Sequence, residues 1–208
     1  MISSIDLFCG AGGLTLGLKR NGIDCKIAVE CEKDFAETFK LNNKNAITIR
    51  DDIAKVCFLE LLKNKKIDLV CGGPPCQGFS TVGKKNEKDE RNSLFWQFLR
   101  TVDEVNPKIV LFENVSGFKR LYNGVAYHTL VSELENKGYK VQSEIMDAAN
   151  FGAPQHRKRT IVIGCKKNLE FKFPIVTHTQ EKTLLTEKFI TLRDAISDLP
   201  KLGVNDSK

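Results

Sequence analysis

Short apolar runs alternate with stretches of helical periodicity along most of the chain. Five runs have the length of buried strands, and they lie at residues 4–8, 26–29, 46–49, 67–71 and 109–112. Between them, apolar side chains recur at the spacing of one helix face, as in Leu14 with Leu18, Phe35 with Phe39, and the stripe from Leu94 to Val102. We expect Phe35 and Phe39 to face the core. The alternation predicts a mostly parallel sheet with helices on both faces.

Two further strands are expected near the end of this pattern. A helical stripe ends at Gly138, after which Val141, Ser143 and Ile145 alternate like a strand, and residues 160–165 form a last apolar run. No helical pattern separates these two strands, so they pair antiparallel or lie apart. We predict an α/β fold with a doubly wound, mostly parallel sheet and one antiparallel strand near its edge.

Length and composition predict one soluble domain. The chain has 208 residues, of which 41% are hydrophobic and 28% charged, enough for one well-buried core. The pattern weakens from about Phe173, so we expect a domain over residues 1–172 and a connecting segment over residues 173–208. No apolar segment has the length of a membrane span, and no signal-like segment precedes the first strand. We therefore expect a cytoplasmic protein.

Cysteine and histidine usage argues against a disulfide framework and against a metal site. The seven cysteines contain no CxxC pair, which is typical of reduced thiols in the cytosol. His128, His156 and His178 do not stand at zinc-ligand spacing with any cysteine. We therefore expect no metal.

The formal charge of +6 is modest, but basic residues gather in two places. The first cluster lies in a glycine-containing loop and the second in a later turn; they are Lys84, Lys85, Lys88 and Arg91, and Arg157, Lys158 and Arg159. Such clusters indicate a polyanionic partner, although a solvated surface would have the same composition.

Glycine, acidic and cysteine residues follow four of the predicted strands. Phe8 ends the first strand and is followed by Gly10, Gly12 and Gly13, while Glu30 follows the second strand, Cys76 the fourth and Glu113 the fifth. In a doubly wound sheet, ligands bind outside these strand ends. Glycines let the backbone approach a ligand, and Glu30 has the place of a carboxylate that accepts both ribose hydroxyls, unless it is a surface carboxylate. The pattern favours a nucleoside; its GxGG spacing differs from the GxGxxG of nicotinamide-binding folds.

Cys76 lies in the stretch GGPPCQGFS, where Pro74 and Pro75 stiffen the turn after the fourth strand. One interpretation is a small buried hydrophobic residue, as most cysteines are. The other is a thiolate exposed in the ligand crevice, which Arg157 and Arg159 would favour electrostatically.

Four stretches resemble, in order, the signature motifs of the cytosine carbon-5 DNA methyltransferases. They are DLFCGAGG at 6–13, GPPCQ at 73–77, ENV at 113–115 and QHRKR at 155–159. The resemblance covers roughly residues 4–200. It implies a Rossmann-like, S-adenosylmethionine-dependent methyltransferase fold.

The resemblance implies covalent catalysis. Carbon 5 of cytosine is too weak a nucleophile to take a methyl group unaided, and Cys76 would activate it by adding as a thiolate to carbon 6. Glu113, kept protonated by burial, would bind ring nitrogen 3 and the exocyclic amine. Arg159 would steady the base and the glutamate, and Arg157 would contact the base or the phosphates. Two residues would brace the pocket without reacting, namely Gln77 and Asn114.

The resemblance also implies a site for S-adenosylmethionine. The residues expected there are Phe8, Gly10, Gly12, Gly13, Glu30, Cys31, Asp52, Ile53, Pro75 and Leu94. In the family pattern, Phe8 lies against the adenine, Glu30 binds the ribose and Asp52 receives the adenine amine. Many members have a bulky side chain at the position of Cys31, so we expect weaker cofactor binding here.

The implied partner is double-stranded DNA with the target cytosine flipped out of the helix. The basic loop 78–92 would cover the flipped nucleotide, or would be a flexible surface loop. Family members carry a target-recognition region and two last motifs after the QHRKR segment, and we find no counterpart here. Residues 192–200 resemble the segment just before that region.

We therefore expect a chain of a bacterial restriction-modification enzyme that is either one of two polypeptides or truncated. Two alternatives remain: an RNA-directed relative acting on transfer RNA, and a catalytically silent domain that binds the cofactor or a partner.

Overall fold

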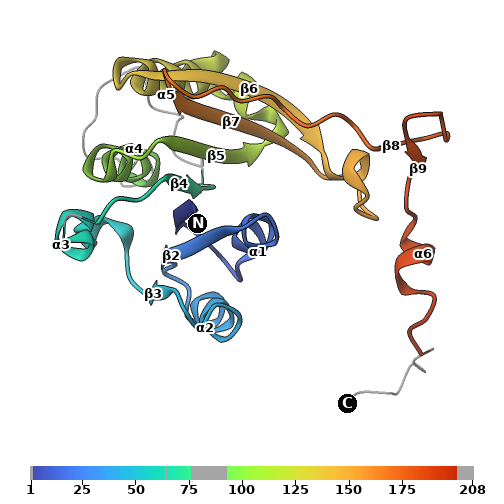
Figure 1. The fold of residues 1–208 in the computed structure, drawn as a ribbon, viewed down its shortest axis with the longest axis horizontal. Coiled ribbons are helices and arrows are strands. Elements are labelled where there is room, and N and C mark those ends of the chain that lie inside the picture. Colours follow the sequence, from blue (N-terminus) through green and yellow to red (C-terminus); the bar gives the residue numbers. More distant parts are fainter. Residues whose placement is uncertain (1, 64, 76–92, 201–208) are drawn as a thin grey trace. The chain divides into compact units, whose positions relative to one another are not determined.

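Figure 1 shows the computed structural model of the chain, which describes residues 2–63, 65–75 and 93–200. Seven strands form one sheet in the order β3-β2-β1-β4-β5-β7-β6. Their bounds are β1 (Ile2–Leu7), β2 (Ile23–Val29), β3 (Ile47–Ile49), β4 (Leu69–Gly72), β5 (Ile109–Val115), β6 (Tyr139–Asp147) and β7 (Lys158–Lys166). The first five pair in parallel. The predicted α/β fold with a mostly parallel sheet is confirmed.

The antiparallel strand is β7, which lies between β5 and β6. At its start, the hydroxyl of Thr160 donates to the carbonyl of Val115 at the end of β5, at 3.1 Å. At its end, the N–H of Lys166 donates to the carbonyl of Lys108, just before β5 begins, at 2.9 Å. The link from β6 contains the 3₁₀ turn η5 (Ala148–Phe151) and no crossover helix, as the sequence predicted.

Helices follow most strands of the sheet. They are α1 (Gly13–Arg20), α2 (Lys33–Asn42), α3 (Phe58–Leu62), α4 (Ser93–Val105), α5 (Val125–Asn136) and α6 (Leu192–Ile196), with 3₁₀ turns η1 (Ile53–Lys55) and η4 (Ser116–Gly124). The strand order reverses between β1 and β4, so right-handed crossovers place α1 and α2 on one face and α4 on the other. Across the described ranges, no helix is both long and apolar enough to cross a bilayer.

Internal contacts divide the chain into two units. The first consists of Met1–Glu144 with Thr160–Phe171, and it contains most of the sheet and helices α1 to α5. The second consists of Ile145–Arg159 with Lys172–Lys208. It contains η5, the two-stranded pairing of β8 (His178–Thr179) with β9 (Glu187–Lys188), and α6, which buries no residue.

The core of the first unit is centred on Phe112 in β5. Its ring centroid lies 5.3 Å from that of Phe98, 6.2 Å from that of Phe95 and 5.0 Å from that of Phe118. All four side chains are at most 1% exposed, so they hold α4 and η4 against β5. A smaller cluster packs where β1 leaves the sheet, and it consists of Cys9, Cys25, Ala28 and Phe39.

Two predicted details are wrong. Phe35 is 52% exposed, because the face of α2 that meets the sheet passes through Ala36 and Phe39. The small side chain of Ala36 lets the helix lie close to the strands. Glu113 does not follow β5 but lies within it, because the pairing with β7 extends β5 to Val115.

Gly72 lies where β4 passes β1, and a Cβ atom there would stand 2.5 Å from the carbonyl oxygen of Leu7. The two residues are direct partners in the parallel pairing, so neither strand can move aside without losing register. We expect Gly72→Ala to lower the free energy of unfolding by about 1–3 kcal/mol, measured by urea denaturation. Gly17→Ala is the control, since a Cβ in that helix meets nothing within 4 Å. It should raise stability by up to about 1 kcal/mol, and equal losses in both variants would contradict the prediction.

Candidate functional site

The carboxyl ends of five parallel strands meet along one row of the sheet. Backbone pairing aligns Leu7, Val29, Ile49, Gly72 and Phe112. The residues directly after them are Phe8, Glu30, Arg50, Gly73 and Glu113. These residues therefore lie at the same edge of the sheet, which includes the reversal of strand order between β1 and β4. Doubly wound sheets bind their ligands at such a point.

The carboxylate of Glu30 binds the turn that follows β1. Oε2 accepts the N–H of Gly10 at 2.8 Å, and Oε1 accepts the N–H of Glu32 at 3.0 Å and the thiol of Cys31 at 3.6 Å. The side chain belongs to a residue that is only 8% exposed, so it is no ordinary surface carboxylate. Backbone donors fix its direction, and Oε2 retains capacity to accept a ligand hydroxyl.

The three glycines of the turn have two different roles. A Cβ atom on Gly10 or Gly13 would meet nothing within 4 Å, so both border open space. A Cβ on Gly12 would stand 2.9 Å from the ring of Phe39, so this glycine is needed for packing against α2. Phe8 has a φ of +58°, a conformation that costs a non-glycine residue free energy and is frequent at ligand sites.

Asp6 is a site residue that the sequence patterns did not single out. It is 1% exposed, and it accepts the hydroxyl of Thr15 at 2.5 Å. Burial raises the pKa of this carboxyl to about 6. The contact joins β1 to α1 and so fixes the two ends of the glycine turn relative to each other. A carboxylate inside an otherwise apolar strand was the available signal.

Glu113 and Asn114 both meet the turn that follows β4. A Cβ atom on Gly73 would stand 2.8 Å from Oε2 of Glu113 and 3.2 Å from its carbonyl oxygen, so the carboxylate lies against the backbone of Gly73. The amide of Asn114 donates to the carbonyl of Pro74 at 2.9 Å, and its oxygen accepts the N–H of Val115 at 2.9 Å. Asn114 therefore braces the turn, and Glu113 borders it.

Cys76, Gln77 and the loop 78–92 lie outside the described residues. Five of the six cysteines in the described ranges have a raised pKa, and burial is the leading cause in each; they are Cys9, Cys25, Cys31, Cys71 and Cys165. A raised pKa keeps a thiol protonated and makes it a poor nucleophile. These five are therefore poor candidates for covalent chemistry.

The remaining cofactor candidates differ in accessibility. Asp52 and Pro75 are exposed, and Asp52 Oδ1 accepts the N–H of Ala54 at 2.9 Å, which caps η1. Leu94 is partly buried against the core. Ile53 is only 3% exposed and belongs to the core, so its side chain offers little surface to a ligand.

Arg157, Lys158 and Arg159 lie in the second unit, where β7 begins. Arg157 and Lys158 are exposed, and the guanidinium of Arg159 donates to the carbonyl of Lys158 at 2.9 Å. The three cations are consecutive in the sequence, and their role in the site stays a prediction.

Asp147 anchors this basic segment, and it was not predicted from the sequence. Its Oδ1 accepts the N–H of Arg157 at 2.9 Å and that of Ala149 at 3.3 Å, and its Oδ2 lies 3.0 Å from Nδ1 of His156. The side chain is 8% exposed. Burial raises the pKa of the carboxyl, but the hydrogen bonds with His156, Ala149 and Arg157 outweigh it, and the pKa is lowered overall.

Comparisons with known proteins agree on one family. A family model described as C-5 cytosine-specific DNA methylase matches residues 2–207. Type II methyltransferase M1.HphI of Haemophilus parahaemolyticus is 36% identical over 99% of this chain and 55% of its own length. Type II methyltransferase M.AquIA of Picosynechococcus is 35% identical over 94% of this chain and 88% of its own length.

A solved structure has the same fold. It is an E. coli prophage-encoded protein described as a DNA modification methyltransferase, with a TM-score of 0.78 and 31% identity over 97% of this chain and 56% of that chain. The chain thus spans about half the length of most curated relatives it matches, and nearly all of M.AquIA.

The lowered pKa of Asp147 predicts a pH-dependent contribution to stability. We expect Asp147→Asn to lower the free energy of unfolding by about 1–2 kcal/mol at neutral pH, because the hydrogen bonds lose their charge assistance. A depressed carboxyl pKa stabilises the fold above the unfolded pKa of roughly 3.9, and this stabilisation is lost as the pH falls through the folded value. The difference from wild type should therefore shrink below about pH 4, measured by urea denaturation across pH.

The control is Asp198→Asn, at an exposed aspartate of the same unit. It should change stability by less than about 0.5 kcal/mol. A loss in Asp147→Asn that stays constant down to about pH 2 would contradict the assignment, because every carboxyl of the unfolded chain is then protonated.

Proposed function

Because this chain belongs to the C-5 cytosine-specific DNA methylase family, we propose that it is the catalytic part of an enzyme that methylates carbon 5 of cytosine in DNA. The observation that carries the proposal is the position of Glu113. Its carboxylate lies against Gly73, in the turn that leads three residues later to Cys76. In the proposal, this carboxyl group and the thiol of Cys76 act together on one pyrimidine ring.

Cys76 is the proposed nucleophile. Its thiolate adds to carbon 6 of cytosine, and the electron pair of the 5,6 double bond becomes available at carbon 5. The carboxyl of Glu113 holds a proton at ring nitrogen 3, which neutralises the charge that enters the ring. After carbon 5 is methylated, a base removes its proton, the double bond re-forms and the thiolate leaves.

Arg157 and Arg159 are proposed to bind the flipped nucleotide. Arg159 would steady the base, and Arg157 would contact the base or its phosphate. A guanidinium presents a rigid set of donors suited to both. The clamp of Asp147 on the Arg157 N–H supports this role, because it holds the backbone of the basic segment in a defined conformation.

The residues of the glycine turn fit S-adenosylmethionine, which would supply the methyl group. Glu30 presents a carboxylate with a fixed direction for the ribose hydroxyls, and Gly10 and Gly13 border open space where a ligand can approach the backbone. The exposed carboxylate of Asp52 would receive the adenine amine. Phe8, Cys31, Ile53, Pro75 and Leu94 complete the proposed site, with Ile53 contributing from the core rather than as an exposed wall.

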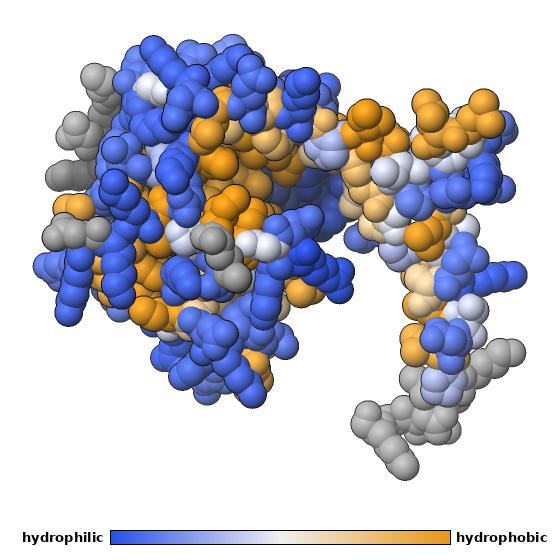
Figure 2. Space-filling model, viewed as in Figure 1, coloured by the Kyte–Doolittle hydropathy of each residue, from blue (hydrophilic) through white to orange (hydrophobic). Residues whose placement is uncertain are grey.

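A second part is proposed to complete the enzyme, supplied by another polypeptide or by further residues. Among the relatives, M.AquIA is itself a chain of similar length, of which this chain covers 88%. Residues 173–208 would begin the connection to the target-recognition region. The surface of this segment supports a protein contact, since Figure 2 shows apolar residues on it, and those most exposed are Ile175, Leu184, Leu185, Leu192 and Leu199.

The substrate is proposed to be duplex DNA with the cytosine flipped into the site, as the family description favours. An RNA-directed enzyme and a silent binding domain are the alternatives. The presence of Cys76 and Glu113 argues against the silent domain, because such a domain has no need of either.

We expect the chain, S-adenosylmethionine and the product of the adjacent gene to form a denaturation-resistant adduct with duplex DNA containing 5-fluorocytosine. Fluorine at carbon 5 cannot leave as a proton does, so the Cys76 adduct is trapped. Mass spectrometry of the digested adduct should locate it at Cys76. Glu113→Gln should slow adduct formation by about 10²–10⁴-fold, because a general acid is lost.

Cys76→Ser tests the nucleophile, and Cys57→Ser, at a partly exposed cysteine away from the strand ends, is the matched control that should react normally. A trap formed with transfer RNA and not with DNA would favour the RNA-directed alternative. A trap formed by the chain alone would overturn the need for a second part. Absence of any trap and of cofactor binding would favour the silent domain.

A further inference from the structure

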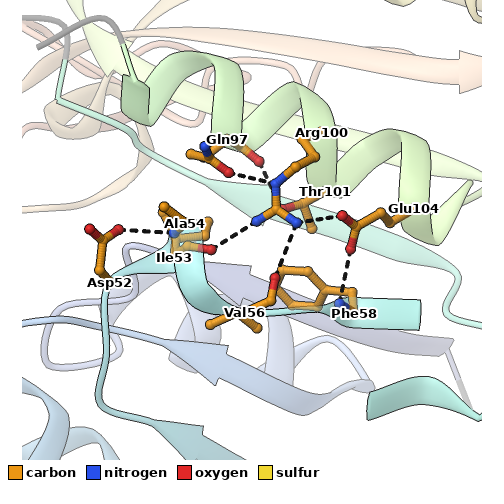
Figure 3. A network of polar contacts seen from close by, with 9 residues as sticks. All are labelled: Asp52, Ile53, Ala54, Val56, Phe58, Gln97, Arg100, Thr101 and Glu104. Carbon is orange, nitrogen blue, oxygen red and sulfur yellow. Dashed lines mark hydrogen bonds and ion pairs between the residues drawn. The ribbon is translucent and has the colours of Figure 1, made fainter. Parts of the chain in front are cut away.

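A polar network joins α4 to the segment that follows Asp52, and Figure 3 shows its members. The guanidinium of Arg100 donates to the carbonyl of Ile53 at 2.8 Å and to that of Val56 at 3.1 Å. Its Nε donates to the side-chain oxygen of Gln97 at 2.5 Å, and its Nη1 pairs with Glu104 one turn later on the helix. Four donor contacts therefore hold one arginine in a single orientation.

Glu104 extends the network to the start of α3. Its Oε2 accepts the N–H of Phe58 at 2.9 Å, while its Oε1 pairs with Arg100. Phe58 is fully buried, and its N–H lies at the first turn of a helix, where intrahelical partners are missing. The Arg100–Glu104 pair thus binds two carbonyls and one N–H of the same irregular segment.

This segment is built from short, irregular elements. Its described residues form the three-residue turn η1 and the five-residue α3, and in η1 the N–H of Lys55 donates to the carbonyl of Asp52 at 3.0 Å and that of Val56 to the carbonyl of Ile53 at 3.1 Å. Ile53, Val56 and Phe58 are buried, so groups left unpaired there would cost free energy. The side chains of Arg100 and Glu104 are 31% and 17% exposed, so their contacts are only partly screened by water.

Asp52 lies at the beginning of this held segment. Its Oδ1 accepts the N–H of Ala54, and the next residue, Ile53, is the one whose carbonyl Arg100 binds. The direction of the Asp52 carboxylate therefore depends on the conformation of residues 52–54. That conformation is held by the cap and by the hydrogen bonds of η1, and Arg100 adds a second donor to the Ile53 carbonyl.

We propose that Arg100 is a positioning residue that aims the Asp52 carboxylate and so sets the preference of the cofactor site for an adenine amine. The inference rests on the proposed function, in which Asp52 receives that amine. Arg100 itself contacts the backbone carbonyls of Ile53 and Val56 (Figure 3). A change at Arg100 should therefore alter how strongly the site prefers a purine with an amine over one without it, in addition to any effect on folding.

The test compares the binding of S-adenosylhomocysteine and S-inosylhomocysteine by isothermal titration calorimetry, using the full chain. The inosine compound replaces the purine amine with a carbonyl oxygen, which a carboxylate acceptor disfavours. We expect wild type to prefer the adenosine compound by about tenfold or more, as one hydrogen bond to a charged group allows. In Arg100→Met this ratio should fall several-fold toward unity, and Arg100→Lys, with one compact donor group in place of the fork, should give an intermediate ratio.

Two further variants separate positioning from stability. Lys108→Met removes another cation that pairs with a carboxylate, at 2.7 Å from Asp68, and should leave the ratio unchanged. Asp52→Ala should abolish the preference, and adding Arg100→Met to it should change the ratio no further. Amide hydrogen exchange at Ala54 and Phe58, the two N–H groups held by the network, should accelerate in Arg100→Met and not in Lys108→Met.

The outcomes are distinguishable. Equal weakening of both ligands in Arg100→Met would overturn the positioning role and leave the proposed function intact. A wild type that binds both ligands equally would overturn the role of Asp52 and this inference with it, again without touching cofactor binding. Binding of neither ligand would contradict the proposed cofactor site and the inference together, and the exchange data would still show whether Arg100 holds the segment. Where Arg100→Met does not fold, the ratio in Arg100→Lys decides.

Discussion

The parallel hydrogen-bond register of β1 to β5 is the constraint on which the candidate site depends. It aligns Leu7, Val29, Ile49, Gly72 and Phe112 across the sheet, so residues more than a hundred positions apart leave it at one edge. A shift of one residue in any strand would turn its side chains to the opposite face. The glycine turn, Glu30 and Glu113 are therefore brought together by backbone pairing that the apolar core stabilises.

Close backbone contacts at this edge restrict which residues can stand there. Gly72 leaves no room for a side chain beside the Leu7 carbonyl, and Gly73 leaves none beside Glu113. The two glycines let β4 approach both neighbours closely as it leaves the sheet. A glutamate facing a larger residue at position 73 would have to turn away. The same reasoning separates Gly12, which packs on Phe39, from Gly10 and Gly13, which border open space.

Apolar patterning predicted the strands well, because buried parallel strands appear as continuous apolar runs of strand length. It placed the end of β5 too early, since Glu113 interrupts the run although pairing with β7 continues to Val115. It placed Phe35 inward, because two phenylalanines four residues apart suggest one face. The small Ala36, which lets α2 approach the sheet, carries almost no signal in such a pattern.

The polar contacts were harder to predict for a different reason. Arg100 and Glu104 stand four residues apart on a helix, a spacing that suggests an ordinary exposed ion pair. Their other partners are the backbone groups of Ile53, Val56 and Phe58. Because every residue has such groups, no residue type in the sequence points to these contacts.

Three acidic residues, Glu30 and Asp52 in the first unit and Asp147 in the second, are held by backbone N–H groups. Glu30 accepts the N–H groups of Gly10 and Glu32, and Asp52 and Asp147 each accept an N–H two residues further along the chain. A backbone donor has a fixed direction and adds no full positive charge. A carboxylate held in this way keeps its charge and part of its acceptor capacity for a ligand, whereas a close lysine or arginine would neutralise it. Backbone fixation therefore suits a site that binds hydroxyls and amines.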